Sequence, residues 1–233
     1  MKFAIMCGIF LICLLCLSGM GTADQAPGVI NQSEKIWNGT WESEGYSLYI
    51  QQSDSEIKGY YEPFNISSQD PGLLEGVLSS DGRVFSGTWS ETGPIAFVLT
   101  SDKLSYTGAG NVRPDASLNS SGSYATIGTR MESSFDPEQL WNGSWKTDRV
   151  INTFIQNGVT VTGSYAPLPD TGDEPGTFTG TVSEDGTTLF GNWSESGNFS
   201  FTISKDDRYW NGTYDMAQNS SAGADSWNAT KVL

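Results

Sequence analysis

The sequence WNGTW at residues 37–41 is repeated as WNGSW at residues 141–145. The two copies lie 104 positions apart, because residue 141 minus residue 37 is 104. The same shift places Trp89 on Trp193, and it aligns glycines and aromatic residues without a gap over most of the chain. A match of this length predicts that the chain contains two homologous units, each large enough to be a domain.

The repeat sets the expected domain boundaries. We expect one unit at residues 36–131, a linker at residues 132–139 and a second unit at residues 140–233. A tail at residues 24–35 precedes them. Residues 1–23 combine a lysine, an apolar run and a cleavage signal of small residues, which is typical of a secretory signal peptide. The sequence therefore predicts a secreted or cell-surface protein, and an uncleaved membrane anchor is the alternative for this segment.

The composition excludes several kinds of chemistry. All three cysteines lie in the predicted signal peptide, and the chain has no histidine. A mature protein without thiol or imidazole groups has no disulfide framework, no Cys/His zinc site, no cysteine nucleophile and no histidine base. With 27 acidic against 12 basic side chains, nucleic acid and anionic membranes are not expected partners. We predict no cofactor and no metal.

The sequence is rich in acceptor sites for N-linked glycans. Ten asparagines begin Asn-x-Ser/Thr with no proline at x, which is more than chance supplies. We expect a glycosylated exterior, although turns rich in Asn, Ser and Thr account for part of the excess. The ten sites are Asn31, Asn38, Asn65, Asn119, Asn142, Asn192, Asn198, Asn211, Asn219 and Asn228.

Each unit has the periodicity of β-structure. Apolar and polar residues alternate in eight short runs, and turn residues interrupt them about every ten positions. Asp81-Gly82 and Asp185-Gly186 are typical of hairpin turns, which join strands that are neighbours in sequence. The fold class that follows is all-β: two tandem antiparallel up-and-down (meander) eight-stranded β-barrels.

Glycines alternate with large side chains on the expected inner face of the strands. Trp37, Gly39 and Trp41 show this pattern, and so do residues 85–89. A glycine in the middle of a flat strand weakens it, because it loses packing and costs entropy. A closed eight-stranded barrel has an interior only wide enough for side chains or one small ligand, so inward glycines relieve crowding. We therefore expect the repeated tryptophans to form mainly the core.

Several strand motifs resemble the avidin and streptavidin family. They are Gly-Thr-Trp at 39–41, Gly-Tyr-Tyr-Glu at 59–62, Gly-Ser-Tyr at 163–165 and the closing segment 227–232. That family has eight-stranded up-and-down barrels, which agrees with the fold expected from periodicity. The chain also resembles uncharacterised Trp- and Gly-rich repeats of secreted archaeal proteins, a resemblance that implies no activity.

The resemblance implies a ligand-binding tyrosine on the third strand and polar contacts near the first strand of each unit. Tryptophans at the ends of the Phe-x-Gly-x-Trp strands are candidates for the pocket walls. The candidate ligand-binding residues are Tyr61, Tyr165, Trp89, Trp193, Ser43 and Thr147. The sequence shows no counterpart of the aspartate that completes the ureido site of that family, so biotin is not the expected ligand.

Three functions fit this pattern. The first is a non-catalytic binding module that holds a small apolar or sugar-like ligand, or a glycan, between aromatic walls. The second is a structural or adhesive envelope protein with filled barrels. The third is a two-carboxylate glycoside hydrolase using Glu91 and Glu195. We expect these glutamates in separate domains, each entering a turn, and therefore favour the non-catalytic functions.

Overall fold

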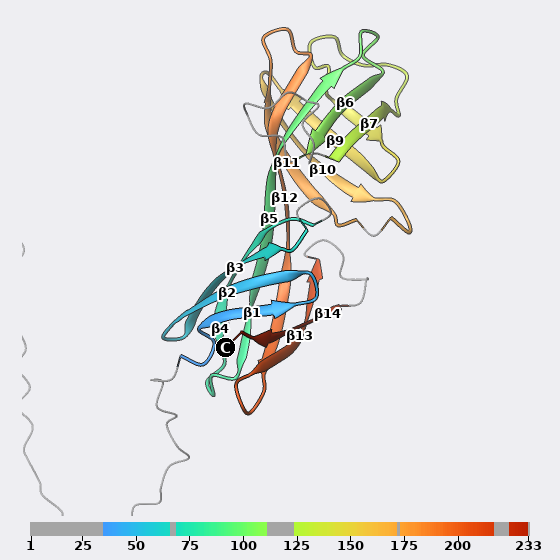
Figure 1. Cartoon of the computed structure of the whole chain (residues 1–233). Coiled ribbons are helices and arrows are strands. Elements are labelled where there is room, and N and C mark those ends of the chain that lie inside the picture. The colour runs from blue at the N-terminus through green and yellow to red at the C-terminus, as the bar shows by residue number, and fades with distance from the viewer. Residues whose placement is uncertain (1–34, 66–68, 111–123, 172, 217–223, 233) are drawn as a thin grey trace, which may run out of the picture. The chain divides into compact units, whose positions relative to one another are not determined.

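The computed structural model describes residues 35–65, 69–110, 124–171, 173–216 and 224–232. These residues form an all-β structure of fourteen strands in one antiparallel sheet (Figure 1). The predicted signal peptide lies outside the described residues. Among the residues that are described, no helix is long and apolar enough to cross a membrane.

The strands of the two repeats correspond one to one. Those of the first repeat are β1 (Gly39–Ser43), β2 (Tyr46–Ser53), β3 (Glu56–Pro63), β4 (Gly72–Leu78), β5 (Val84–Leu99), β6 (Ser105–Gly110) and β7 (Tyr124–Arg130). Those of the second are β8 (Gly143–Lys146), β9 (Val150–Asn157), β10 (Thr160–Pro167), β11 (Gly176–Val182), β12 (Thr188–Ile203), β13 (Tyr209–Met216) and β14 (Asp225–Lys231). Strands β2 to β5 recur in β9 to β12 with the shift of 104 residues that the sequence shows.

Strands that are neighbours in sequence pair throughout the sheet, and β1 pairs with β14 to close it. Two strands depart from this simple order. Strands β5 and β12, each sixteen residues long, also pair with each other in antiparallel register. Figure 1 shows this pair, which we call the central ribbon, running through both groups of strands.

The central ribbon divides the pairing into two closed circuits of eight strands. The first lobe contains β1 to β4, the first half of β5, the second half of β12, and β13 and β14. The second lobe contains the second half of β5, β6 to β11 and the first half of β12. Each lobe therefore takes strands from both repeats.

This pairing differs from the expected one, in which each repeat closes on itself. The expected turns after Glu91 and Glu195 are absent: both residues lie inside long strands, and they face each other directly in the central ribbon. The alternation of inward and outward side chains continues through Glu91 and Gly93 without a break, so the segment can extend as a strand. The second half of β5 then pairs within the other lobe, which is a strand exchange within one chain.

Two separate hydrophobic cores follow from the exchange. The core of the first lobe joins residues 37–89 of the first repeat to residues 199–229 of the second. The core of the second lobe joins residues 95–106 of the first repeat to residues 141–193 of the second. Each core thus depends on side chains that lie far apart in the sequence.

The repeated WNGxW motif lies where the first strand of each repeat begins. Trp37 and Trp41 are fully buried, which confirms the prediction that they belong to the core. The indole NH of Trp41 donates to the carbonyl of Trp37 at 3.0 Å, and that of Trp37 donates to Gly82 at 3.0 Å. Gly39, however, is exposed and has φ of +133°, so this glycine, the first residue of β1, permits a bend where the strand begins and does not lie on the inner face.

The glycines within the strands do permit close approach of neighbouring backbones. Gly76 and Gly87 face each other across β4 and β5. A Cβ atom on Gly87 would overlap the carbonyl oxygen of Glu75, and one on Gly76 would overlap that of Ser86. These glycines therefore prevent crowding between adjacent strands, because a methyl group at either position would overlap the neighbouring backbone.

Cleavage of the linker tests the strand exchange. A protease site inserted at residues 136–138, which are exposed, should be cut without separating the two halves, because each core needs strands from both. We expect the cleaved protein to elute as one species in native size-exclusion chromatography and as two fragments in denaturant. Two folded fragments that separate under native conditions would contradict the exchange.

Candidate functional site

The third strand and the central ribbon of the first lobe place a tyrosine against a glutamate. Tyr61 on β3 is 2% exposed, and its hydroxyl donates to Oε1 of Glu91 on β5 at 2.8 Å. Trp89, Glu91 and Gly93 occupy every second position of β5 and therefore lie on the same face of the strand. The Glu91 carboxyl thus points inward, like the buried Trp89 side chain. The tyrosine predicted to bind ligand therefore holds a partly buried carboxyl group.

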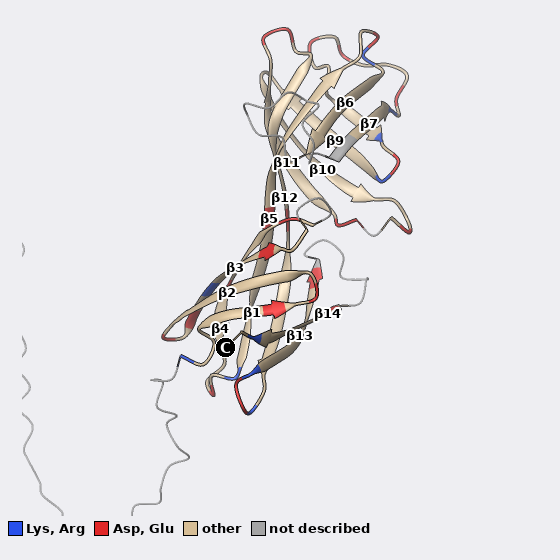
Figure 2. Cartoon of the chain, in the orientation of Figure 1, with Lys and Arg blue, Asp and Glu red and all other residues tan. Residues whose placement is uncertain are grey.

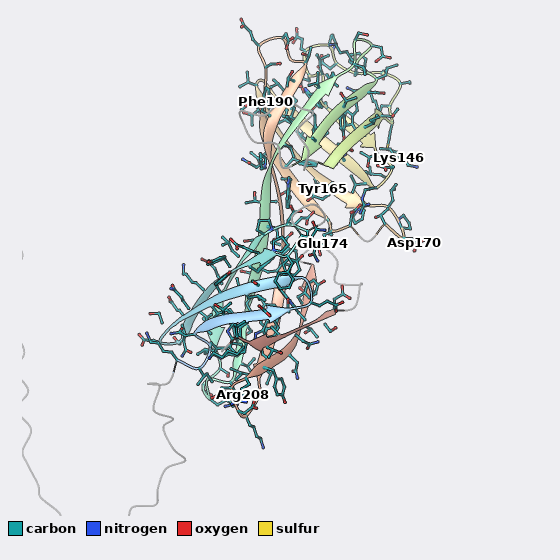
Figure 3. The ribbon with its side chains drawn as sticks, in the orientation of Figure 1. Lys146, Tyr165, Asp170, Glu174, Phe190 and Arg208 are labelled. Carbon is teal, nitrogen blue, oxygen red and sulfur yellow. The ribbon has the colours of Figure 1, made fainter. Side chains whose placement is uncertain are left out.

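The second repeat supplies the same pair from the other side. The Tyr165 hydroxyl donates to Oε1 of Glu195, and Glu195 lies directly opposite Glu91 in the central ribbon. Glu174, from the segment between β10 and β11, completes the group. One carboxylate oxygen from each of the three glutamates lies within 4.8 Å of the others. Figure 3 shows Tyr165 and Glu174 near the level where β5 and β12 pass from one lobe to the other.

The protein environment favours the protonated forms of these carboxyl groups. Burial is the main cause that raises the pKa of Glu91 to about 8, and the negative charges of Glu174 and Asp70 add to the effect. The hydrogen bond from Tyr61 acts in the opposite direction. Burial also raises the pKa of Glu195 and of Glu174, which are hydrogen-bonded to each other. Neutral carboxyl groups that share protons can stay close without a cation, and we assign no metal to this cluster.

A cavity of about 940 Å³ opens beside Glu91 in the first lobe. Seven aromatic side chains line it: Tyr46, Tyr61, Trp89, Tyr209, Trp210, Tyr214 and Trp227. The ring of Trp227 contacts those of Tyr46, Tyr61, Trp210 and Tyr214, and the ring of Tyr214 also contacts that of Trp89. Aromatic walls around a few polar groups are the usual composition of a small-molecule site. We call this space the aromatic cavity.

The structure brings together only part of the predicted site. Tyr61 and Trp89 line the aromatic cavity, whereas Tyr165 and Trp193 pack in the core of the second lobe. The Ser43 hydroxyl is buried without a hydrogen-bond partner. The Thr147 hydroxyl accepts hydrogen bonds from the backbone of Arg149 and Val150 and so stabilises a turn, and its contact with a ligand stays a prediction.

The described glycan acceptor sites fall into two groups. Asn65, Asn192, Asn198, Asn211 and Asn228 are exposed. Asn38 and Asn142 are only partly exposed, and each side-chain oxygen accepts a hydrogen bond from a backbone NH of the neighbouring strand. Asn31, Asn119 and Asn219 lie outside the described residues. Glycosylation stays a prediction at all ten sites.

Sequence reasoning did not place Tyr46, Tyr209, Trp210, Tyr214 or Glu174 in the site, and it reached Trp227 only through the resemblance to the avidin family. Tyr46, Tyr214 and Trp227 line the cavity, but none of them is an aromatic residue repeated in the other copy. Glu174 lies 104 residues after Asp70, since 174 minus 70 is 104, so the repeat offered a signal for two equivalent acids. The sequence alone did not show that these acids are close in space, because the exchanged strand pairing is what brings the acids of both repeats together.

No protein family model, curated protein or solved structure matches this chain. The resemblance to avidins therefore stays a prediction, and the functional argument depends on the geometry of the site.

The glutamate cluster predicts an unusual dependence of stability on pH. Glu91 has a pKa of about 8 in the folded protein against 4.5 for an unperturbed glutamate, so the folded state binds the proton more tightly. This stabilisation is complete below pH 4.5 and is lost as the pH rises through 8, by up to about 1.4 kcal/mol per pH unit for each group. We expect the melting temperature to fall between pH 5 and pH 9.

Glutamine variants separate this effect from the general acidity of the protein. Glu91→Gln and Glu195→Gln mimic the protonated groups and should flatten the pH dependence, whereas Glu56→Gln, at an exposed site on β3, should leave it unchanged. A melting temperature that rises from pH 5 to pH 9, or equal slopes in all variants, would show that the cluster is ionised in the folded protein.

Proposed function

We propose that the protein is a secreted, non-catalytic binding protein whose first lobe holds a small ligand. The aromatic cavity is the observation that carries this proposal. Its volume of about 940 Å³ lies within the range of small-molecule sites. In this proposal each lobe acts as an eight-stranded barrel, the predicted glycans cover the exterior, and the ligand enters at the end of the first lobe near the central ribbon.

The walls of the cavity suit an apolar or sugar-like molecule, as the sequence predicts. Trp227 meets Tyr61 edge to face at a centroid distance of 5.2 Å and Tyr214 at 5.7 Å. The Trp89 indole is fixed by a 3.0 Å hydrogen bond from its NH to the carbonyl of Asp215. Rings held in this way are preorganised, so binding orders few side chains and costs less entropy.

The alternative function, a structural protein with filled barrels, describes the second lobe better than the first. Phe97, Tyr106 and Phe154 pack against one another in its interior, with ring centroids 4.7 to 6.4 Å apart. Asn152 fills the position equivalent to Leu48 and donates to the Tyr106 hydroxyl at 2.7 Å. We infer that the second lobe supports the first through the central ribbon and that binding belongs to the first lobe.

Ligand binding is testable by thermal stability. A compound that binds only the folded protein stabilises it by about 2.7 kcal/mol at 100 times its dissociation constant, which corresponds to a rise of at least about 5 °C. We expect such a rise, with a saturable change in tryptophan fluorescence, for at least one member of a panel of sugars, aryl glycosides and small charged and uncharged organic compounds.

A pair of aromatic variants locates the site. Trp227→Leu should abolish the effect of the ligand, whereas Tyr60→Leu, which removes an exposed ring stacked on Tyr49 outside the cavity, should preserve it. A panel without any binder, or equal binding by both variants, would refute the proposed function.

The pairing of Glu91 with Glu195 also favours a second candidate, two-carboxylate glycoside hydrolysis. Retaining enzymes of this kind hold two carboxyl groups about 5 Å apart, one protonated and one ionised. If the protein acts in this way, it hydrolyses aryl glycosides, and Glu91→Gln and Glu195→Gln each reduce the rate by at least about 100-fold. The non-catalytic proposal expects no release of the aryl group above the buffer rate.

A further inference from the structure

The aromatic cavity carries negative charge without a basic counterpart. Glu42, Glu44 and Glu91 line it, and among the described residues of its lining none is Lys or Arg. The charge of Asp70 also reaches this space, because it raises the pKa of Glu91. Figure 2 shows acidic positions in red on β1 and on β5 near the passage between the lobes. The electrostatic potential in the cavity is therefore negative.

The aromatic rings surround the space from several strands. Tyr46 on β2 lies 6.0 Å from Trp227 on β14, and Tyr61 on β3 lies 5.2 Å from it, measured between ring centroids. Tyr214 on β13 links this group to Trp89 at 6.3 Å. All these contacts are edge to face. Such contacts fix the orientation of rings that line the cavity, and the negative face of an aromatic ring attracts a cation.

The second lobe provides an internal comparison. Thr126 stands at the position of Trp227, because Thr126 pairs with Gly108 as Trp227 pairs with Gly212. Gly110 stands at the position of Tyr214, which it precedes by 104 residues. In the same way Val150 follows Tyr46 by 104 residues. Tyr209 corresponds in the same way to Ser105, so four of the seven aromatic wall residues are aromatic in the first lobe only.

The geometry points to an organic cation, a molecule with an alkylated ammonium group, as the ligand of the aromatic cavity. This inference rests on the proposed function and names the chemical class of its ligand. The ammonium group lies against the faces of Trp227 and Tyr214, and the carboxylate of Glu91 neutralises its charge. The apolar alkyl groups leave water and pack against the aromatic rings. Aromatic rings together with a carboxylate are suited to recognise quaternary ammonium compounds.

The charge distribution argues against the other ligand classes. An anion would meet Glu42, Glu44 and Glu91 without a basic partner in the lining. A neutral sugar would use the ring faces, but it would gain nothing from the negative potential. Only a cation uses both the carboxylates and the rings.

The experiment compares choline with 3,3-dimethylbutan-1-ol, which has the same shape and no charge. Both are titrated into the full chain at pH 8.5, above the pKa of Glu91 of about 8, with tryptophan fluorescence and melting temperature as readouts. We expect choline to bind saturably and at least ten times more tightly than the neutral isostere. Equal binding of the two compounds, or no binding of choline, would overturn the inference.

Variants connect the binding to the cavity. Glu91→Gln should weaken choline binding at least tenfold and leave the isostere unchanged, whereas Glu56→Gln should have no effect. Trp227→Leu should abolish choline binding and Trp227→Phe should retain most of it, because Phe keeps an aromatic face. An unchanged affinity in Glu91→Gln or in Trp227→Leu would overturn the assignment.

The outcomes for the inference and for the proposed function are distinct. If a sugar or an uncharged compound binds and choline does not, the ligand class is wrong and the binding function stands. If choline and the whole panel fail to change either readout, both are wrong.

Discussion

The pairing of β5 with β12 is the constraint on which the other features of the structure depend. Fifteen residue pairs join two strands whose centres lie about 100 residues apart in the sequence. The inner face of this ribbon contributes to both hydrophobic cores, with Phe85 and Trp89 in the first lobe and Phe97 in the second. Because neither repeat closes by itself, the stability of each lobe depends on the other half of the chain.

The same ribbon creates the polar centre of the molecule. Two copies of one glutamate, separated by a whole repeat, become direct neighbours where the strands cross from lobe to lobe. Tyr61 and Tyr165 hold these groups by hydrogen bonds, so the carboxyl groups are both shielded and fixed. The site next to them is not symmetric, since Tyr46, Tyr214 and Trp227 have no aromatic counterparts in the second lobe.

Much of the fold follows from local sequence. The period of 104 residues, the alternation of apolar residues and the turn residues predicted the all-β class and most strand positions, because these signals reflect each strand's own environment. The strand exchange between the lobes could not be predicted from the sequence. Whether the chain turns after Glu91 or continues as a strand, the inward side chains have almost the same neighbours. The role of Thr147 was also beyond reach, because a hydroxyl that caps a turn and one that contacts a ligand look alike in sequence.

The interleaved order of strands has a consequence for synthesis of the chain. The first lobe needs β13 and β14, which leave the ribosome after the other described strands. Until then the inner faces of β1 to β5 have no complete partner, although their residues were made more than a hundred positions earlier. Long-range pairing of this kind slows folding and leaves edges open to other chains. The dense acidic charge and the predicted glycans would keep such a half-built molecule from joining its neighbours.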